Sequence, residues 1–354
     1  MAVGLSGGVD SSVAAALLSQ QGYSVCGITM EIYDGSAGLQ GSVKHACYGP
    51  GEKEDVESAA AVCEKLKIPF QAIDLRQEYK SHVIDYFRSE YLEGKTPNPC
   101  VVCNQKLKFG FLLAKAREAG LDFDYFATGH YARIVKSGSR FLLKRAADRS
   151  KDQTYFLYGL TPQQLAHTLF PVGDYAKQQV REMARELGLQ TADRTESQDF
   201  IDGRDYSILF AEDEIKAGEI VDEKGRVLGE HRGIIHYTVG QRRGLGIASH
   251  RPLYVSRIDA ANNRVVVSHH ERRSKGLVAG DFNWIAVDRI DRPLDVQVKI
   301  RLRHKETDAT VYPADKNQTK ILFKEPQMSV TPGQSAVIYA DDTVLGGGII
   351  TAPL

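Results

Sequence analysis

A glycine- and serine-rich stretch near the beginning of the chain has the residue types of a phosphate-binding loop. It follows a short apolar run and reads Ser6-Gly7-Gly8-Val9-Asp10-Ser11-Ser12. Glycines let a backbone approach a ligand closely, and the free N–H groups where a helix begins bind anions. The Asp10 carboxylate could hold Mg²⁺ or orient the loop. The plainer alternative is a strand-to-helix turn with a serine cap, because no lysine follows the glycines as in the common P-loop.

A second stretch, a polar and proline-rich loop, carries a pair of thiols. It reads Thr96-Pro97-Asn98-Pro99-Cys100-Val101-Val102-Cys103-Asn104-Gln105-Lys106. A C-x-x-C pair in a reducing compartment can be a redox couple, half of a metal site or a sulfur carrier. A zinc site needs two more ligands, and the sequence has no second C-x-x-C. The alternative is a pair of buried cysteines that act as small apolar residues. The polar surroundings favour chemistry.

The other cysteines are less informative. Cys47 lies in a glycine-rich loop and could also handle sulfur, whereas Cys26 and Cys63 fall on apolar faces of a predicted strand and helix. Five cysteines at uneven spacing do not form a secreted disulfide framework. Without a signal-peptide pattern or an apolar run of ~18 residues, we expect a cytoplasmic protein with reduced thiols.

Strands and helices alternate over the first 205 residues. Strands are expected at Ala2–Leu5, Ser24–Met30, Phe70–Asp74 and Tyr125–Gly129. Helices are expected at Ser12–Gln20, Asp55–Leu66, Glu78–Leu92 and Phe109–Gly120. This alternation predicts an α/β domain with a mostly parallel sheet and helices on both faces. Ligands in such folds bind at the carboxyl ends of the strands, where the glycine loop lies.

Beyond residue 205 the sequence changes to short β-rich runs. After a last helical piece at Asp205–Lys216, strands are expected at Glu219–Val221, Gly233–Thr238, Leu253–Asp259 and Arg264–Ser268. Evenly spaced strands then predict a closed or nearly closed β-barrel, at Asn283–Val287, Leu294–Lys299, Ala309–Tyr312, Thr319–Phe323, Ser335–Tyr339 and Val344–Thr351. We therefore expect an α/β domain at 1–205, a small β-rich central domain at 206–269 and a β-barrel at 270–354.

The overall composition is that of a folded globular protein. Of 354 residues, 42% are hydrophobic and 25% are charged, which excludes a disordered or collagen-like chain. Lys+Arg and Asp+Glu both number 45, so the formal net charge is zero. A nucleic-acid partner would therefore have to be bound by local basic clusters.

The glycine loop resembles the PP-loop of ATP pyrophosphatases, which adenylate a carbonyl oxygen and release pyrophosphate. Together with the stretch around Cys100 and Cys103, it resembles the tRNA-specific 2-thiouridylases. The resemblance extends over essentially the whole chain through Ala127-Thr128-Gly129-His130-Tyr131, Lys151-Asp152-Gln153-Thr154-Tyr155-Phe156-Leu157, Glu196-Ser197-Gln198-Asp199-Phe200-Ile201, His236-Tyr237-Thr238-Val239-Gly240-Gln241-Arg242-Arg243-Gly244 and Gly346-Gly347-Gly348.

The resemblance implies replacement of the 2-oxygen of the wobble uridine by sulfur, in tRNAs for Lys, Glu and Gln. ATP and Mg²⁺ are the implied cofactors. The implied ATP-binding residues are Gly4, Leu5, Ser6, Gly7, Gly8, Val9, Asp10, Ser11, Met30 and Gly129. A plain core role is the alternative for Met30.

The chain departs from the family pattern at the sulfur site. Many members have Asp-x-x-Cys in the first loop and a persulfide-carrying cysteine in the second, whereas this chain has Cys100-x-x-Cys103 and Asp199. Cys103 takes the nucleophile position. We expect Cys100 and Cys103 to form the sulfur-handling pair, with Asp199 as acid/base or ligand. Either a cysteine persulfide delivers sulfur and the pair closes as a disulfide, or Cys100, Cys103 and Asp199 hold an iron–sulfur cluster that binds sulfide.

The resemblance also implies where tRNA binds. Asn98, Pro99 and Cys100 would meet the flipped base, and the segment that begins Lys151, Asp152 and Gln153 would touch the tRNA. The need for local positive charge on a neutral chain adds the candidate contacts Arg242, Arg243, Arg301 and Arg303. An ordinary solvated face is the alternative for each basic cluster taken alone. We expect a monomer that receives sulfur from a donor protein or sulfide and binds no membrane.

Two other functions share some of these features. An ATP-dependent ligase or amidating enzyme acting on a small metabolite would share the glycine loop, but it would have no use for C-x-x-C or the β-rich C-terminal part. A non-catalytic RNA-binding protein with a relic nucleotide fold is the second alternative, and the intact glycine loop argues against it.

Overall fold

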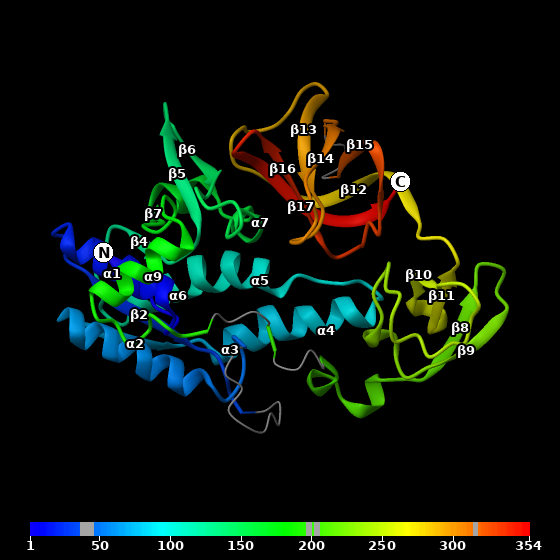
Figure 1. The fold of residues 1–354 in the computed structure, drawn as a ribbon, viewed down its shortest axis with the longest axis horizontal. Helices are drawn as coiled ribbons and strands as arrows, with labels where there is room; N and C mark the ends of the chain where they lie inside the picture. The colour runs from blue at the N-terminus through cyan, green and yellow to red at the C-terminus, as the bar shows by residue number, and fades with distance from the viewer. Residues whose placement is uncertain (36–45, 196–199, 202–205, 314–317) are drawn as a thin grey trace. The chain divides into compact units, whose positions relative to one another are not determined.

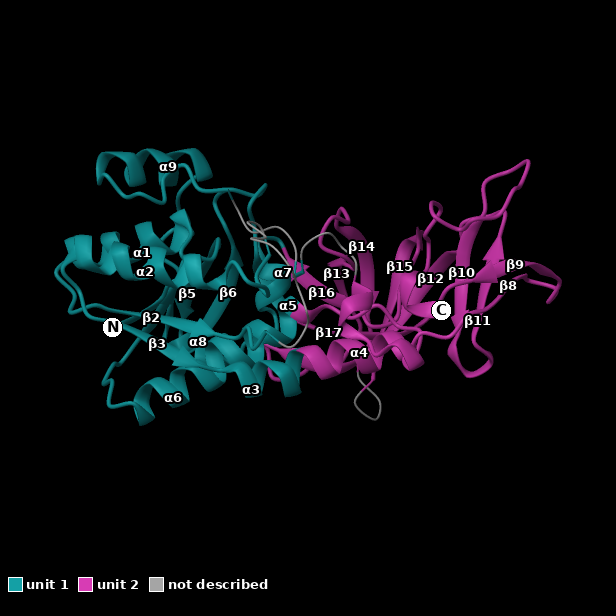
Figure 2. Ribbon diagram, turned by 90° about the horizontal axis from the view of Figure 1, so that it is seen from below, with its two compact units in different colours: residues 1–83, 100–205, 341–345 teal, residues 84–99, 206–340, 346–354 magenta. Residues whose placement is uncertain are grey.

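The computed structural model describes residues 1–35, 46–195, 200–201, 206–313 and 318–354 (Figure 1). The chain forms two compact units (Figure 2). Unit 1 contains residues 1–83, 100–205 and 341–345, and unit 2 contains residues 84–99, 206–340 and 346–354.

Unit 1 is built around a parallel sheet, as predicted. Its strands lie in the order β3-β2-β1-β4-β7, and each neighbouring pair is parallel. Since β2 and β4 flank β1, the strand order reverses between β1 and β4, and α/β folds bind ligands at such a reversal. The bounds are β1 Ala2–Gly4, β2 Cys26–Glu31, β3 Phe70–Asp74, β4 Phe126–Thr128 and β7 Thr168–Leu169.

The first helix, α1 (Val9–Gln20), is buried on two sides, between the sheet and α9 (Lys177–Glu186). On one side Val13 packs in a cluster with Val180 of α9, and on the other Leu18 packs with Val3 of β1. Small side chains make room for both contacts, because Ala14, Ala15 and Ala16 are fully buried. α2 (Glu52–Leu66) contributes to both clusters. This packing fixes the beginning of α1 at the end of β1.

Two helical runs contain π-helical turns, which the sequence analysis missed. The predicted helix Glu78–Leu92 consists of α3 (Arg76–Tyr79), the π-helical η1 (Lys80–Ile84) and α4 (Asp85–Leu92). The second run consists of α5 (Pro99–Val102), the π-helical η2 (Cys103–Phe111) and α6 (Leu112–Glu118). The expectation of a loop at the cysteines is therefore wrong from Pro99 onward, because a proline is well tolerated where a helix begins.

The rest of unit 1 contains an unpredicted hairpin of β5 (Ala132–Ser137) and β6 (Arg140–Arg145). Two short helices, α7 (Thr154–Leu157) and α8 (Pro162–Ala166), follow. Thr343, the first residue of β17 (Thr343–Pro353), pairs with Lys144 of β6.

Unit 2 contains a sheet with the order β10-β11-β8-β9. Its strands are β8 Gly218–Asp222, β9 Val227–His231, β10 Tyr254–Asp259 and β11 Arg264–Ser268. Two predictions in this region are wrong. The expected helix Asp205–Lys216 contains the short 3₁₀ turns η4 (Tyr206–Leu209) and η5 (Glu212–Glu214), and the expected strand Gly233–Thr238 contains the 3₁₀ turn η6 (Ile234–His236).

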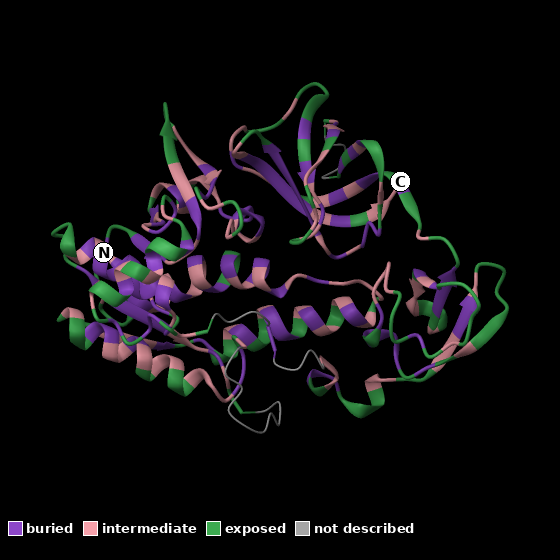
Figure 3. Cartoon of the chain, in the orientation of Figure 1, coloured by how far each residue is buried: buried purple, intermediate pink, exposed green. Residues whose placement is uncertain are grey.

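The C-terminal strands of unit 2 form a closed barrel in the order β12-β15-β14-β13-β16-β17, with β17 paired back to β12. Buried and exposed residues alternate along several of its strands (Figure 3). Gly346 and Gly348 belong to the closing strand, and backbone atoms of β12 occupy the space that a side chain would need. The remaining bounds are β12 Arg273–Trp284, β13 Leu294–Lys299, β14 Thr307–Val311, β15 Thr319–Met328 and β16 Ser335–Ala340.

The predicted fold class is thus confirmed: an α/β region with a parallel sheet, a small β-rich region and a barrel. In the part of the chain that the structure describes, no helix is long and apolar enough to span a membrane.

Candidate active site

The glycine loop connects β1 to α1 at the reversal of strand order. Gly8 caps the helix, and its carbonyl oxygen accepts hydrogen bonds from the Ser11 Oγ at 3.2 Å and the Ser12 Oγ at 2.8 Å. The Ser6 backbone N–H donates to the Ser11 Oγ at 3.2 Å. These bonds hold the loop in a tight turn at the helix N-terminus, where the peptide dipoles favour an anion.

Gly7 is the residue of the loop that most requires the absence of a side chain. Its φ is +69°, and an added Cβ would lie 2.6 Å from the Asp55 carbonyl oxygen. The Gly7 carbonyl oxygen accepts bonds from the Arg194 Nη1 at 2.7 Å and the Ser58 Oγ at 3.2 Å. Arg194 also pairs with the Asp55 carboxylate at 2.9 Å. Burial raises the pKa of Asp55, and Arg194 opposes that shift.

Asp10 is held by two partners that the sequence analysis did not identify. The Lys177 Nζ donates to both carboxylate oxygens, at 2.8 and 2.7 Å, and the Tyr131 hydroxyl donates to Oδ1 at 2.8 Å. Lys177 is buried. This arrangement favours the orienting role of Asp10 over the Mg²⁺-binding role, because both oxygens are already engaged.

Several expected nucleotide-binding residues gather around the same strand ends. An added Cβ on Gly129, which follows β4, would collide with the backbone of Asp10 and Ser11. Gly4 and Leu5 lie at the end of β1, where the Leu5 N–H bonds to the Ile28 carbonyl oxygen of β2 at 2.8 Å. Met30 is partly buried near the end of β2. The glycine loop thus follows β1, Gly129 follows β4 and Met30 lies near the end of β2, and both β2 and β4 are neighbours of β1.

The two thiols of the C-x-x-C pair lie on one helical run. Cys100 lies in α5, Cys103 begins η2, and both are half-buried. Burial raises the pKa of Cys103 to about 11, and the charge of Lys108 counteracts this rise. Lys108 is five residues after Cys103. Because π-helical hydrogen bonds join residues five apart, η2 brings these two residues closer to one face than an α-helix, which would set them about 140° apart.

Lys108 also acts on a second buried group. Burial holds the pKa of His130 well below its usual value, and Lys108 lowers it further. His130 is fixed by the Thr128 hydroxyl, 2.7 Å from Nδ1. Because the lowered pKa keeps His130 neutral, His130 adds no positive charge near Cys103. Lys108 supplies the positive charge that lowers the pKa of Cys103.

The expected second loop lies outside the described residues at Asp199, so the structure does not place that carboxylate. Phe200, the next residue, does have a position. Its carbonyl oxygen accepts a hydrogen bond from the Tyr48 N–H at 3.2 Å, and its ring lies 6.4 Å from that of Tyr79. Burial raises the pKa of Tyr79 well above its usual value, and charges on Cys103, Cys47 and Cys100 raise it further. Tyr79 is therefore within electrostatic range of these three thiols.

The segment expected to contact tRNA in unit 1 is tied to the glycine loop. The Tyr131 N–H donates to the Gln153 Oε1 at 2.8 Å, and the Gln153 N–H donates to the Tyr131 carbonyl oxygen at 2.9 Å. Asp152 accepts a bond from the Ala146 N–H at 3.0 Å. Lys151 is half-buried. Asp152 and Gln153 therefore support the fold around Tyr131, and their contact with tRNA stays a prediction.

The loop before the thiols is fixed within unit 2 by the barrel. The Thr96 N–H bonds to the Pro332 carbonyl oxygen at 2.9 Å, and the Gln334 Nε2 bonds to the Thr96 carbonyl oxygen at 2.8 Å. Asn98 is half-buried and Pro99 is buried. Backbone contacts thus set the path of this stretch up to the helix that carries Cys100.

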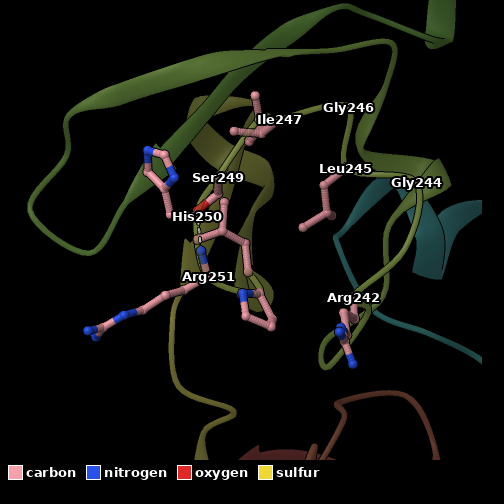
Figure 4. A pocket seen from close by; sticks show the side chains of 11 residues that line it. Arg242, Gly244, Leu245, Gly246, Ile247, Ser249, His250 and Arg251 are labelled. Atoms are coloured by element: carbon pink, nitrogen blue, oxygen red, sulfur yellow. Dashed lines mark hydrogen bonds between the residues drawn. The ribbon is translucent and has the colours of Figure 1, made fainter.

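The other expected basic contacts lie in unit 2. Arg242 borders an open pocket of about 540 Å³, with Arg251 on its opposite side (Figure 4). Arg242, Arg243 and Arg303 are exposed, whereas Arg301 is half-buried and donates to the Met328 carbonyl oxygen at 3.1 Å. The sequence analysis missed Arg251 as part of this pocket.

The important omissions were Lys177, Arg194 and Lys108. Lys177 and Arg194 are more than 160 residues from the loop atoms they bind, so spacing gave no signal for them. Lys108 lies in the quoted cysteine stretch, but only a π-helical turn brings it to Cys103.

Comparisons with known proteins cover the whole architecture. Residues 1–201 match the tRNA methyl transferase HUP domain, 209–269 the tRNA methyl transferase PRC-barrel domain and 274–350 the aminomethyltransferase beta-barrel domain. The tRNA-specific 2-thiouridylase MnmA of Acetivibrio thermocellus is 48% identical over 98% of both chains. The MnmA of Clostridioides difficile is 46% identical over 99% of this chain and 98% of that protein.

One solved structure that matches part of this chain is the U34-tRNA thiolase NcsA of Methanococcus maripaludis with its 4Fe–4S cluster. It is 18% identical, with a TM-score of 0.36, and the match covers 59% of this chain and 62% of that one.

Proposed function

The chain belongs to the tRNA-specific 2-thiouridylase family, and on this premise we propose that it thiolates the wobble uridine of tRNA at C2, with ATP as the activating substrate. The observation that carries the proposal is the identity of 48% over nearly the full length of a named 2-thiouridylase. A phosphate-type loop and a thiol pair within one compact unit support it.

The first step is activation of the uridine. Its O2 attacks the α-phosphorus of ATP, the bond to the β-phosphate oxygen breaks, and pyrophosphate leaves. The uridine O2, which is now bonded to both C2 and the α-phosphorus, has thereby become part of an AMP leaving group. N–H groups at the beginning of α1 and the Ser6 and Ser11 hydroxyls would stabilise phosphate charge. Lys177 and Tyr131 orient Asp10, and Gly129 and Met30 would border the nucleotide.

The second step is sulfur transfer. The terminal sulfur of a persulfide on Cys103 attacks C2, AMP leaves, and the base is joined to Cys103 through two sulfur atoms. The Cys100 thiolate then attacks the Cys103 Sγ, which releases 2-thiouridine and leaves a Cys100–Cys103 disulfide. A dithiol reductant reopens that disulfide. Lys108 would stabilise the anionic sulfur at Cys103, since a thiolate or persulfide anion is the reactive form.

The described residues do not fit a metal centre. Among them, no three side chains of His, Cys, Asp or Glu are grouped so as to hold a metal ion, and Asp199 lies outside that part of the chain. Mg²⁺ would reach the site with the phosphates of ATP, whose charge it neutralises, because Asp10 is already bound to Lys177.

The proposed tRNA contacts come from both compact units. We propose that Asn98–Cys100 meet the flipped base and that Arg242, Arg243, Arg301 and Arg303 bind phosphates of tRNAs for Lys, Glu and Gln. The functional division would follow residues 1–205, 206–269 and 270–354. We propose a cytoplasmic monomer supplied by a sulfur donor protein or by sulfide. Sulfide would attack the Cys103 Sγ of the Cys100–Cys103 disulfide, which leaves the Cys103 persulfide and a Cys100 thiolate and needs no other oxidant.

A direct test measures products of ATP cleavage with and without unmodified tRNA. We expect AMP and pyrophosphate to form in a tRNA-dependent manner. Equal cleavage without tRNA, stimulated by a small metabolite, would favour the alternative of an ATP-dependent ligase.

A further inference from the structure

Three of the five thiols lie within electrostatic range of one buried tyrosine, and they are called the thiol group below. Charges on Cys103, Cys47 and Cys100 all act on the Tyr79 hydroxyl, which is 2% exposed. The other two thiols lie elsewhere: Cys63 belongs to a core cluster, and the Cys26 Sγ donates to the Met1 carbonyl oxygen at 3.5 Å. Cys47 is therefore a third member of the thiol group, although it is more than fifty positions away in the sequence.

The segment that carries Cys47 is anchored directly on Tyr79. The ring of Tyr48, the next residue, stacks on that of Tyr79 with 5.3 Å between centroids and 10° between planes. The ring of Tyr33 packs edge-on against Tyr48 at 5.2 Å, and the Tyr48 hydroxyl donates to Asp34 at 3.1 Å. With the bond from the Tyr48 N–H to the Phe200 carbonyl oxygen, these contacts hold the backbone next to Cys47 against Tyr79.

Cys47 and Cys103 affect each other electrostatically and share one cation. Charge on Cys47 raises the pKa of Cys103, whereas Lys108 lowers the pKa of both thiols. The two differ in access: Cys47 is exposed and Cys103 is half-buried. Protein packs around the Cys47 thiol closely enough that burial raises its pKa, while the residue as a whole keeps an exposed surface. A donor can therefore reach Cys47 more easily than Cys103.

We propose that Cys47 is the entry thiol for sulfur, which takes a persulfide from a donor and passes the outer sulfur to Cys103. This inference rests on the proposed function and adds a residue to it. In the transfer, the Cys103 thiolate attacks the outer sulfur of Cys47–S–SH. The sulfur–sulfur bond at Cys47 breaks, a new one forms at Cys103, and Cys47 leaves as a thiolate. The number of persulfides is unchanged, so no external oxidant or reductant is required.

The test follows persulfide position with glutathione persulfide as the small donor. Wild-type protein and the variants Cys47→Ser, Cys103→Ser and Cys26→Ser are sampled over time, alkylated and mapped by mass spectrometry. In wild-type protein we expect label at Cys47 first and then at Cys103. Cys103→Ser should trap label on Cys47, and Cys47→Ser should slow labelling of Cys103 by at least tenfold. Cys26→Ser is the matched control and should behave as wild type.

The result that would overturn the inference is labelling of Cys103 at the wild-type rate in Cys47→Ser. Cys47→Ala serves as a second variant, and thermal denaturation of both variants verifies that they fold. Thiolation of tRNA by wild-type protein is measured in parallel. If that reaction proceeds while Cys47→Ser labels Cys103 normally, the entry role fails and the proposed function stands. If Cys103 is labelled through Cys47 but tRNA gains no sulfur, the proposed function fails.

Discussion

At the candidate site the Lys177 ammonium binds both carboxylate oxygens of Asp10, and this interaction can be tested by removing the cation. Lys177→Met leaves the Asp10 carboxylate with only the Tyr131 hydroxyl among the partners described above. An unsatisfied, partly buried carboxylate costs about 1–3 kcal/mol. We expect tRNA-dependent pyrophosphate release to fall at least tenfold, because the loop loses its orientation.

The control for this prediction is Lys53→Met, since Lys53 is 86% exposed and pairs only weakly with Glu57 at 4.0 Å. Lys177→Arg should restore part of the activity. A Lys177→Met enzyme that releases pyrophosphate at the wild-type rate would show that Asp10 does not need its partner.

Lys108 has a predicted effect on the pH dependence of Cys103. Burial raises the Cys103 pKa to about 11, and Lys108 lowers it, so Lys108→Met should raise that pKa further. Below its pKa, a thiol loses about tenfold in thiolate fraction for each unit by which the pKa rises. We expect slower alkylation of Cys103 by iodoacetamide at pH 8 to 9, by roughly threefold to tenfold, with the rate profile displaced to higher pH.

Lys106→Met is the matched control, because Lys106 is exposed on the same helical run. Alkylation is mapped by mass spectrometry so that Cys103 is distinguished from Cys100 and Cys47. An unchanged profile in Lys108→Met would remove Lys108 from the sulfur site.

At the residue scale, sequence could identify the groups with chemistry but not their partners. The glycine loop and the C-x-x-C pair have recognisable local spacing. Lys177 and Arg194 reach the glycine loop through tertiary packing, and no local sequence pattern indicates that they do. The sequence shows that Cys47 is a thiol in a glycine-rich loop. Only the tertiary stacking of Tyr48 on Tyr79 shows that Cys47 lies on the same side of the domain as the C-x-x-C pair.

The turn between β1 and α1 makes a prediction about stability. Gly7 has a φ of +69°, which disfavours any residue with a side chain. In Gly7→Ala the added Cβ would also lie 2.6 Å from the Asp55 carbonyl oxygen. Backbone strain of this kind costs on the order of 1–3 kcal/mol, and the collision adds to it. We expect the melting temperature to fall by roughly 4–8 °C and ATP binding to be lost, as measured by calorimetry.

Gly138→Ala isolates the effect of the collision, because Gly138 has a φ of +61° with no atom within 4 Å of an added Cβ. We expect this control to lose about 1 kcal/mol and to keep its affinity for ATP. Equal destabilisation by the two substitutions would indicate that Asp55 exerts no steric constraint on the loop.

At the element scale, long or regularly patterned segments were predictable and irregular ones were not. Strand Phe70–Asp74 and strand Arg264–Ser268 match their predicted bounds. The π-helical turns η1 and η2 escaped prediction because their period differs from that of the α-helix. The apolar run around Ile234 was read as a strand, but there it forms a buried 3₁₀ turn that packs in the core of the central sheet.

At the scale of the whole molecule, a neutral chain must bind tRNA through local charge. The double variant Arg242→Ala, Arg243→Ala removes two exposed cations from the central sheet region. The slope of log affinity against log salt should become shallower by roughly 1.4–1.8, since each phosphate contact contributes about 0.7–0.9. Filter binding at several salt concentrations measures this slope.

Arg226→Ala is the control, because Arg226 is exposed but already paired with Asp222 at 2.7 Å. We expect its salt dependence to match that of wild-type protein. A double variant with unchanged affinity at every salt concentration would exclude Arg242 and Arg243 from the tRNA interface.

The barrel could be predicted as a class because its strand and turn signals are local and evenly spaced. Its closure between β12 and β17 could not be read from spacing, since it joins distant parts of the chain. Spacing also could not show which residues make up each compact unit, because residues 84–99 belong to unit 2 and residues 341–345 belong to unit 1. Long-range pairing and packing decide these assignments.

The most direct test of the central claim is mass spectrometry of nucleosides from unmodified tRNA incubated anaerobically with the protein, ATP, Mg²⁺ and sulfide. A parallel reaction contains glutathione persulfide in place of sulfide. We predict 2-thiouridine at the wobble position, dependent on ATP and lost in both Asp10→Asn and Cys103→Ser. Unmodified uridine in all reactions, or 2-thiouridine formed equally well without ATP, would contradict thiolation through an adenylated base.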